Sequence, residues 1–269
     1  MKNYAIMLLF DVDYANPNGD PETGRPRISP EGKSVITPEC IKHKLRIQMM
    51  RRGDDVLHLH DGYEEAVVNR LKEKGYTYET FKEGELSFCD IRLFGATDKK
   101  KGIIDVTIPG AFTPSFPISI DKVDMAQPRV NRSYMVADEK LGNAYAMDGH
   151  IYVQYALYPV FWRMNYYAAR DNGVTDKDVQ KMLEAMTTLF ADDSSTNRPP
   201  GSMNVRRIYV WEWEGDGIHG PSDVQLMNSI VVKKKYAIPY SFEDYDIDCT
   251  FYERGVDQLC RMELYYDNV

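Results

Sequence analysis

The sequence has few cysteines and no long apolar run. Its four cysteines form neither a C-x-x-C pair nor the clustered spacing of a zinc site, so we expect reduced and mostly buried thiols. No stretch approaches the roughly 18 apolar residues of a membrane-spanning helix. The first residues lack the basic region and small-residue cleavage site of a signal peptide. These absences predict a soluble, cytoplasmic protein without membrane contact.

The signatures of common enzyme classes are also absent. The chain has no G-x-S-x-G element, no P-loop and no Rossmann fingerprint, and nothing in it points to a cofactor. A small-molecule enzyme on a ferredoxin-like scaffold is therefore a weak alternative. The length of 269 residues and the hydrophobic content of 43% fit one elaborated domain over residues 1–269.

Charge is distributed unevenly along the chain. The formal net charge of -8 opposes binding to phosphates as a whole. Residues 21–52, however, carry eight basic and three acidic side chains, whereas residues 242–269 carry eight acidic side chains and two arginines. A basic and an acidic surface can therefore coexist. In an assembly of repeated copies, this asymmetry would help neighbouring copies to align, because the basic surface of one copy would attract the acidic surface of the next.

The clearest predicted strand covers residues 4–12. Its even positions are all apolar, as expected for a face that packs on helices. Asp11 and Asp13 fall on the odd positions, which we expect to form a more open face of the sheet. The turn Asn16-Pro17-Asn18-Gly19-Asp20 follows, with Gly19 expected to provide a positive φ.

Two helices have clear N-terminal signals. Thr37 followed by Pro38 predicts a helix that ends near Gly53, with Ile41, Leu45 and Met49 as its buried stripe. Thr175 with Asp178 three residues later predicts a second helix with a capping-box-like start. A shorter helix is predicted over residues 64–74.

Further strands are predicted over residues 89–95, 103–108, 150–162, 206–213 and 230–234. The order strand, helix, strand, strand, helix, strand predicts an α+β fold of the ferredoxin-like or RNA-recognition-motif-like kind. Four prolines interrupt residues 109–149, which we expect to form a projecting hairpin or arm within the domain. Aromatic residues at strand spacing, such as Trp211 and Trp213, are expected in the core, although they could also stack on bases.

Several of these motifs together resemble a known family. The Asn16–Asp20 turn, the segment Gly24-Arg25-Pro26-Arg27, the basic helix that Thr37 opens and the segment Leu93-Phe94-Gly95-Ala96 come in the order found in the backbone subunit of type I CRISPR surveillance (Cascade) complexes. This subunit is the seventh CRISPR-associated family, and the chain is most similar to its subtype I-C branch. The resemblance spans most of the chain.

The resemblance implies a shape and a role. Members have an RNA-recognition-motif-like palm, a finger insertion and a thumb hairpin, and members of this branch are not nucleases. Their copies stack into a helical filament along the guide RNA, and each thumb presses at a regularly displaced nucleotide. Implied partners are the CRISPR guide RNA, the target DNA strand, further copies of the chain, a guide-processing endonuclease and a large subunit.

A subunit that accepts any guide sequence should contact sugar and phosphate and leave the base edges to the target strand. Arginine side chains and the backbone amides of turns suit that task. The candidate palm contacts are Asn16, Asn18, Gly19, Arg25, Arg27, Lys42, Arg46 and Arg52. The candidates in the acid-free stretch 194–207 are Arg198, Arg206 and Arg207, and those in the thumb are Arg129, Asn131, Arg132 and Met135.

A metal-dependent ribonuclease is the main alternative. Asp11 and Asp13, together with Asp20, would hold a divalent cation, as a loop aspartate does in the related backbone subunits of type III complexes. A strand end solvated by water explains the two aspartates equally well, and carboxylates without a metal would repel a guide phosphate. His58-Leu59-His60 has metal-like alternation but no evident third ligand.

Overall fold

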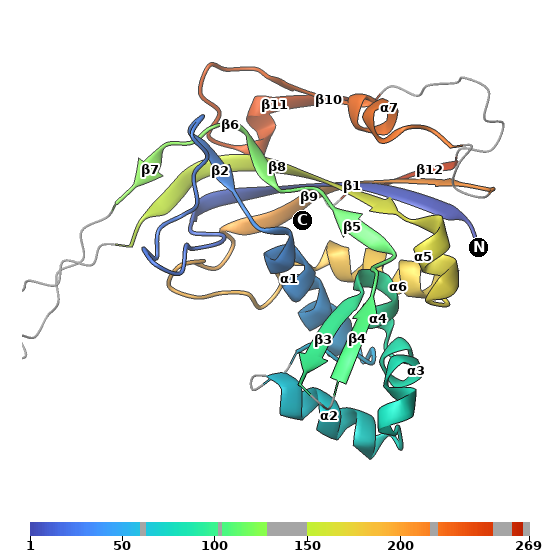
Figure 1. Cartoon of the computed structure of the whole chain (residues 1–269). Helices are drawn as coiled ribbons and strands as arrows, with labels where there is room; N and C mark the ends of the chain where they lie inside the picture. The colour runs from blue at the N-terminus through green and yellow to red at the C-terminus, as the bar shows by residue number, and fades with distance from the viewer. Residues whose placement is uncertain (60–62, 102–103, 128–149, 216–219, 250–259, 266–269) are drawn as a thin grey trace, which may run out of the picture.

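The computed structural model of the chain describes residues 1–59, 63–101, 104–127, 150–215, 220–249 and 260–265 (Figure 1). Its helices, with two short 3-10 turns, are α1 (Pro38–Arg51), α2 (Tyr63–Glu73), η1 (Tyr78–Thr80), α3 (Phe81–Leu86), α4 (Cys89–Phe94), α5 (Tyr166–Asp171), α6 (Asp176–Thr187), α7 (Asp223–Asn228) and η2 (Phe242–Asp244). Its strands are β1 (Asn3–Ala15), β2 (Lys33–Val35), β3 (Ala96–Lys100), β4 (Ile104–Ile108), β5 (Phe112–Pro114), β6 (Ile118–Lys122), β7 (Met125–Ala126), β8 (Tyr152–Met164), β9 (Met203–Trp213), β10 (Ile230–Lys234), β11 (Tyr245–Cys249) and β12 (Cys260–Tyr265). Among the described residues, no helix is long and apolar enough to cross a membrane, and Cys40 and Cys89 form no disulfide.

An antiparallel sheet in the order β12-β9-β1-β8-β5 forms the body of the molecule, and β7 pairs with the far end of β8. β1 lies at its centre and pairs with both long strands, β8 and β9. The strands predicted over residues 4–12, 150–162 and 206–213 are thereby confirmed: β1 and β9 are a few residues longer than expected, and β8 is shifted by two residues. The fold is mixed α and β with antiparallel sheets, as predicted.

One face of this sheet is covered by α1 and α6 (Figure 1). The even side chains of β1 are buried there against Ile41, Leu45 and Met49 of α1 and Met182 of α6. Thr37 caps α1, and the Thr175–Asp178 pair forms the capping box of α6, as the sequence predicted. The spacing of apolar residues was sufficient to predict both helices, because each buries a single stripe of apolar side chains.

The opposite face of the sheet is not open, and this prediction was wrong. α7 and the β10–β11 hairpin lie over it (Figure 1). Met7 and Leu9 are buried against Trp211 and Trp213 of β9 and Leu226 of α7. Because both faces are covered, Asp11 lies in the interior, whereas Asp13 at the end of the strand is exposed. The two tryptophans belong to the core, as expected.

Residues 57–108 include a small lobe below the sheet, built from α2, α3, α4 and the β3–β4 hairpin around a core of its own (Figure 1). The strand predicted over residues 89–95 is instead α4, and the hairpin partner of β4 is β3. Apolar residues alternate in Cys89-Asp90-Ile91-Arg92-Leu93, which imitates a strand. The helix buries Asp90 as well, because its carboxylate accepts the amides of Leu57 (2.9 Å) and His58 (3.2 Å).

The prediction of an arm over residues 109–149 is wrong for its first part, residues 109–127. This part pairs in the body, because β5 and β7 pair with β8 and β6 pairs with β2. Residues 128–149 lie outside the described residues, and so do the candidates Arg129, Asn131, Arg132 and Met135.

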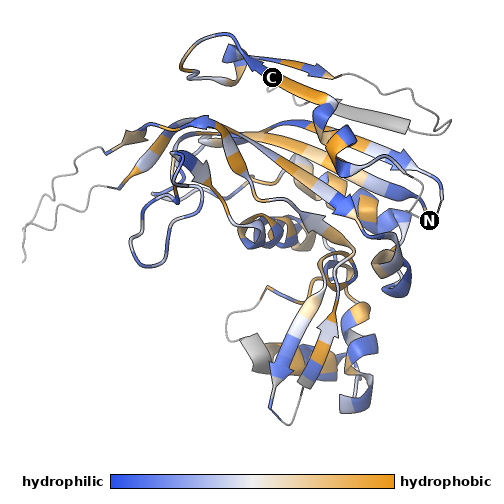
Figure 2. Ribbon diagram, turned by 45° about the horizontal axis from the view of Figure 1, so that its top comes forward, coloured by the Kyte–Doolittle hydropathy of each residue, from blue (hydrophilic) through white to orange (hydrophobic). Residues whose placement is uncertain are grey.

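The strands of the large sheet are largely apolar, whereas the loops beneath the end of the sheet where β7 lies are mainly hydrophilic (Figure 2).

Candidate nucleic-acid interface

The polar turn after β1 is joined directly to the start of α1. Asn18 accepts the amide of Thr37 (2.9 Å), and the Thr37 hydroxyl accepts the amide of Cys40 (3.3 Å). The buried Asn16 donates to the carbonyl of Gly24 (2.8 Å), which closes the loop. Asn16 and Asn18 therefore shape the loop with their side chains. The positive φ expected at Gly19 is found at Gly24 instead (66°).

α1 presents its polar residues in two directions. Besides the buried stripe, one set faces the end of α6 and another lines a groove toward the small lobe. The set toward α6 comprises Lys44, Gln48, Arg51 and Arg52. The set along the groove comprises Glu39, Lys42, His43 and Arg46. These two faces give the basic residues of α1 different roles.

The α6-facing set holds the end of α6 and the loop after it. Gln48 (2.8 Å) and Arg51 (3.0 Å) donate to the carbonyl of Ala191, and Arg52 donates to the Thr188 hydroxyl (3.0 Å). Carbonyls near a helix C-terminus lack intrahelical donors and attract cations. Arg52 is thus already engaged in the fold, outside the groove.

The groove between α1 and the small lobe has a volume of about 890 Å³. Arg46 is engaged within it, through Asp90 (3.1 Å) and the ring of Phe94 (5.4 Å). Among the described residues Lys42 forms no ion pair, and partial burial lowers the pKa of its ammonium, although Glu39 raises it. His43 also lines the groove, and our sequence reasoning missed it. The spacing 39, 42, 43 and 46, one face of a helix, was the signal that could have found it.

The wall of the groove opposite α1 is a close crossing of two backbone segments. A Cβ at Gly110 would lie 2.6 Å from the carbonyl oxygen of Phe94. Gly95 has a φ of 74°, and a Cβ there would collide with the carbonyl of Ile108. Only glycine allows this approach. The crossing connects the small lobe to the body and sets the width of the groove.

Two arginines lie on the loop that follows β1. Arg25 is exposed and forms no ion pair within the described residues, whereas Arg27 pairs with Asp20 at 3.4 Å. This loop is tied to the loop after α6, because the amide of Asn16 donates to the carbonyl of Asn197 (2.7 Å). Arg25 and the groove residue Lys42 are the two candidate cations that the described fold leaves unpaired.

The arginines of the acid-free stretch 194–207 are all engaged, and the carboxylates that pair with two of them come from outside the stretch. Arg198 pairs with Asp193 (3.0 Å), and Arg206 pairs with Asp11 of β1 (2.8 Å). The guanidinium of Arg207 donates to the carbonyl of Arg206 (2.9 Å) and lies over the ring of Phe242. Arg206 therefore pairs with a carboxylate inside the fold, whereas Arg25 and Lys42 have no such partner among the described residues.

The two aspartates of the alternative reading are in different environments. Asp11 is fully buried and accepts from Tyr155 (3.1 Å) and Arg206 (2.9 Å). Partial burial and the nearby Asp11 carboxylate raise the pKa of Asp13. Asp20 accepts the amides of its own turn. Among the described residues, no group of three or more His, Cys, Asp or Glu is arranged to hold a metal. Asp11 therefore serves as the counter-ion of Arg206.

Comparison with known proteins places this α+β chain in a family. The sequence profile of CRISPR-associated protein Cas7 matches residues 2–250. The chain therefore belongs to the Cas7 family, which confirms the resemblance at the level of the family.

Solved structures add only a weak likeness. One titled "CRISPR RNA-guided surveillance complex" is 12% identical, with a TM-score of 0.47, covering 82% of this chain and 72% of its own. Another, titled "CRISPR RNA-guided surveillance complex, pre-nicking", is 11% identical, with a TM-score of 0.46, covering 84% and 86%. No curated protein matches. The family assignment rests on the profile.

Proposed function

We propose that this Cas7-family chain is a non-enzymatic backbone subunit that binds a CRISPR guide RNA and repeats along it in a surveillance complex. The single observation that carries the proposal is the family match over residues 2–250. Within the complex, the subunit would leave the bases of the guide free to pair with a target DNA strand. A guide-processing endonuclease and a large subunit are the further partners that we propose. Assignment to subtype I-C stays a prediction.

The architecture supports a palm of the RNA-recognition-motif kind. The chain order β1, α1, β5, β8, α6, β9 and the sheet order β9-β1-β8-β5 correspond to the ferredoxin-like arrangement. We assign the finger to the small lobe and the thumb to residues 128–149. The whole chain then forms one elaborated domain with both parts inserted into it.

The groove along α1 is the proposed path of the guide backbone. Lys42 and the exposed Arg25 have no ion pair among the described residues. A phosphate near Lys42 would stabilise its charged form, which partial burial disfavours. Contacts of this kind are indifferent to sequence, as a guide-binding subunit requires.

The test is charge reversal at these two positions. Lys42→Glu and Arg25→Glu should each weaken binding to unrelated single-stranded RNAs by similar factors. Each should also reduce the slope of log K against log salt by about 0.7, the contribution of one phosphate contact on a single strand. Lys72→Glu, at an exposed position of α2 outside the groove, is the matched control. Loss of affinity for some sequences only would contradict backbone binding.

A cleavage assay tests the alternative that the chain is a metal-dependent ribonuclease. Labelled single-stranded RNA incubated with the pure protein and magnesium or manganese should remain intact. The reason is that the Arg206 guanidinium already compensates the charge of Asp11. Cleavage that Asp11→Asn abolishes in a folded variant would replace the proposal with a ribonuclease.

A further inference from the structure

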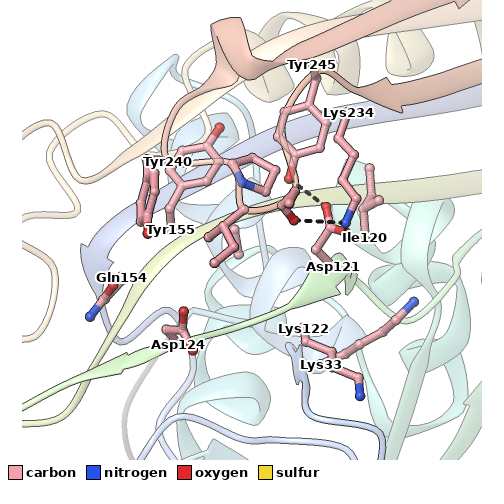
Figure 3. A pocket seen from close by; sticks show the side chains of 14 residues that line it. Lys33, Ile120, Asp121, Lys122, Asp124, Gln154, Tyr155, Lys234, Tyr240 and Tyr245 are labelled. Carbon is pink, nitrogen blue, oxygen red and sulfur yellow. Dashed lines mark hydrogen bonds and ion pairs between the residues drawn. The ribbon is translucent and has the colours of Figure 1, made fainter.

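A second hollow lies on the other face of the sheet from α1. Its volume is about 490 Å³, and it is lined by residues of β6 and β8 on one side and of the loop between β10 and β11 on the other (Figure 3). Tyr155 and Tyr245, which belong to its wall, pack in the core of the face that α7 and β10–β11 cover. The hollow is therefore separate from the groove along α1.

The wall of this hollow is rich in aromatic and apolar groups. The rings of Tyr155 and Tyr245 lie 6.5 Å apart, and their hydroxyls donate to Asp11 (3.1 Å) and Asp121 (3.0 Å). Tyr240 also lines the hollow but is 62% exposed, and it makes no ring contact within the described part of the chain. A planar, apolar face of this kind accepts a flat heterocycle.

The loop that carries Tyr240 is held in place by hydrogen bonds at both of its ends. The amides of Tyr240 (2.8 Å) and Ser241 (3.0 Å) donate to the carboxylate of Asp244. At the other end, the Lys234 ammonium donates to the carbonyl of Ala237 (3.3 Å). Because the backbone that carries Tyr240 is already held, only the side chain has to be ordered when a ligand binds, which lowers the entropic cost of binding.

Two lysines form the opposite rim of the hollow. Lys33 of β2 and Lys122 of β6 face each other directly across the strand pair, an arrangement of like charges that destabilises a sheet. Neither forms an ion pair among the described residues. The charge of Asp121 is already matched by Lys234 (2.7 Å), so that two lysines oppose only Asp124 at the rim. An anion bound at this rim would relieve the repulsion between the lysines.

We propose that this hollow is a nucleotide subsite. The base lies against Tyr240 and Ile238, and the phosphate lies at Lys33 and Lys122. The amide of Gln154, on the same side as Tyr240 in Figure 3, offers a donor and an acceptor to the base edge. The favoured source is a single strand of nucleic acid, because a strand presents an unpaired base together with its phosphate. The subsite goes beyond the proposed function, since it lies across the sheet from the guide path.

Two variants of the full chain, one single and one double, test the subsite. Affinity for a 5′-labelled oligouridylate is measured for Tyr240→Ala and for Lys33→Glu/Lys122→Glu. Tyr236→Ala is the matched control, because Tyr236 is equally exposed (62%) on the same loop but does not line the hollow. Tyr240→Ala should weaken binding about ten-fold, the effect of losing one base stack, and Tyr236→Ala should not. Equal effects of the two tyrosine variants would overturn the proposal.

A photocrosslinking arm locates the base directly. Oligonucleotides containing 4-thiouridine should crosslink to the peptide that contains Ile238 and Tyr240, and this crosslink should disappear in Lys33→Glu/Lys122→Glu. Absence of the crosslink from a wild-type protein that binds the strand would overturn the proposal. Uridine monophosphate separates the sources: saturable binding that Tyr240→Ala removes supports a free nucleotide, and binding of the oligonucleotide alone supports a strand.

The variants also separate this subsite from the guide path. If Lys42→Glu weakens binding and Tyr240→Ala does not, only the subsite is wrong. If Tyr240→Ala weakens binding and Lys42→Glu does not, the guide path along α1 is wrong. A wild-type chain that binds neither the oligonucleotide nor the mononucleotide would overturn both.

Discussion

At the scale of single residues, buried charge in this chain is matched by partners that are distant in the sequence. Asp11 and Arg206 lie on neighbouring strands, and Arg92 of α4 pairs with Asp178 of α6 at 2.6 Å. Removing one member of such a pair leaves an uncompensated charge in the interior, which costs about 3–5 kcal/mol. Most acidic side chains of the interior follow this rule, and Glu85 departs from it.

Glu85 of the small lobe is fully buried, and neither carboxylate oxygen has a hydrogen-bond partner among the described residues. Burial first, and then the nearby Asp98 carboxylate, raise the pKa of Glu85 from 4.5 to about 7. The folded state therefore holds this proton more tightly than the unfolded chain does. The free energy of unfolding is therefore highest, as far as Glu85 affects it, below pH 4.5. It falls as the pH rises to about 7 and stays reduced above that pH.

Glu85→Gln should therefore stabilise the protein at pH 8 and have little effect at pH 4.5. The expected gain at pH 8 is at most about 3 kcal/mol, since each unit of pKa shift corresponds to about 1.4 kcal/mol. Denaturant unfolding of both proteins at the two pH values measures it. Glu83→Gln, an exposed neighbour on α3, is the control and should change neither curve. A gain that is the same at both pH values would contradict the assigned pKa.

At the scale of elements, the contacts that connect the small lobe and α1 to the rest of the molecule are made largely by backbone groups. The small lobe is connected to the body where residues 94–95 cross residues 109–110. α1 is connected to the loop after α6 by donors that meet backbone carbonyls. These joins fix the groove between α1 and the small lobe, so that a change at the crossing acts on the groove as well as on stability.

Gly95→Ala should destabilise the protein much more than Gly173→Ala. Both glycines have a similar positive φ, 74° and 71°, which costs about 1–3 kcal/mol for a residue with a Cβ. The surroundings of Gly173 are open, whereas a Cβ at Gly95 would meet the backbone of Ile108, and overpacking adds about 1–3 kcal/mol. The free energies of unfolding of the two variants measure the difference. Equal losses would mean that the crossing can relax without cost.

At the scale of the whole molecule, one sheet is covered on both faces, and the small lobe projects from it. α1 and α6 lie on one face, and α7 with β10 and β11 lies on the other (Figure 1). The two proposed nucleic-acid sites therefore lie on opposite sides of β1. The proposed thumb, residues 128–149, lies between β7 and β8, which pair with each other.

Replacing residues 128–149 with Asn-Gly should leave the domain folded and abolish its assembly along RNA. Ala126 lies directly opposite Tyr152, so a five-residue connection can close this hairpin. Thermal unfolding should give a midpoint close to that of the intact chain, and sedimentation with a long single-stranded RNA should show no array of copies. A large loss of stability would mean that these residues belong to the core and would remove the thumb assignment.

Local patterns in the sequence were enough for the longest helices and strands of the fold, β1, β8, β9, α1 and α6. The alternation along β1 and the caps at Thr37 and Thr175 predicted these elements correctly. Such patterns report on the backbone, since burial of one face and satisfaction of helix ends involve residues close in the chain. The failure at residues 89–95 has the same origin, because an alternating pattern hid a helix whose Asp90 is held by amides more than 30 residues away.

The sequence by itself determined the family, the α+β class and the cations that could contact RNA. Only the tertiary structure decided which of those cations the fold already uses. Arg206 and Arg52 are engaged by Asp11 and Thr188, whereas Arg25 and Lys42 form no ion pair within the described residues. The pair of Asp11 and Arg206 joins residues far apart in the chain, and no local periodicity records which carboxylate a folded chain brings to which guanidinium. The covering of the odd face of β1 was decided in the same way, by elements that follow it by more than 200 residues.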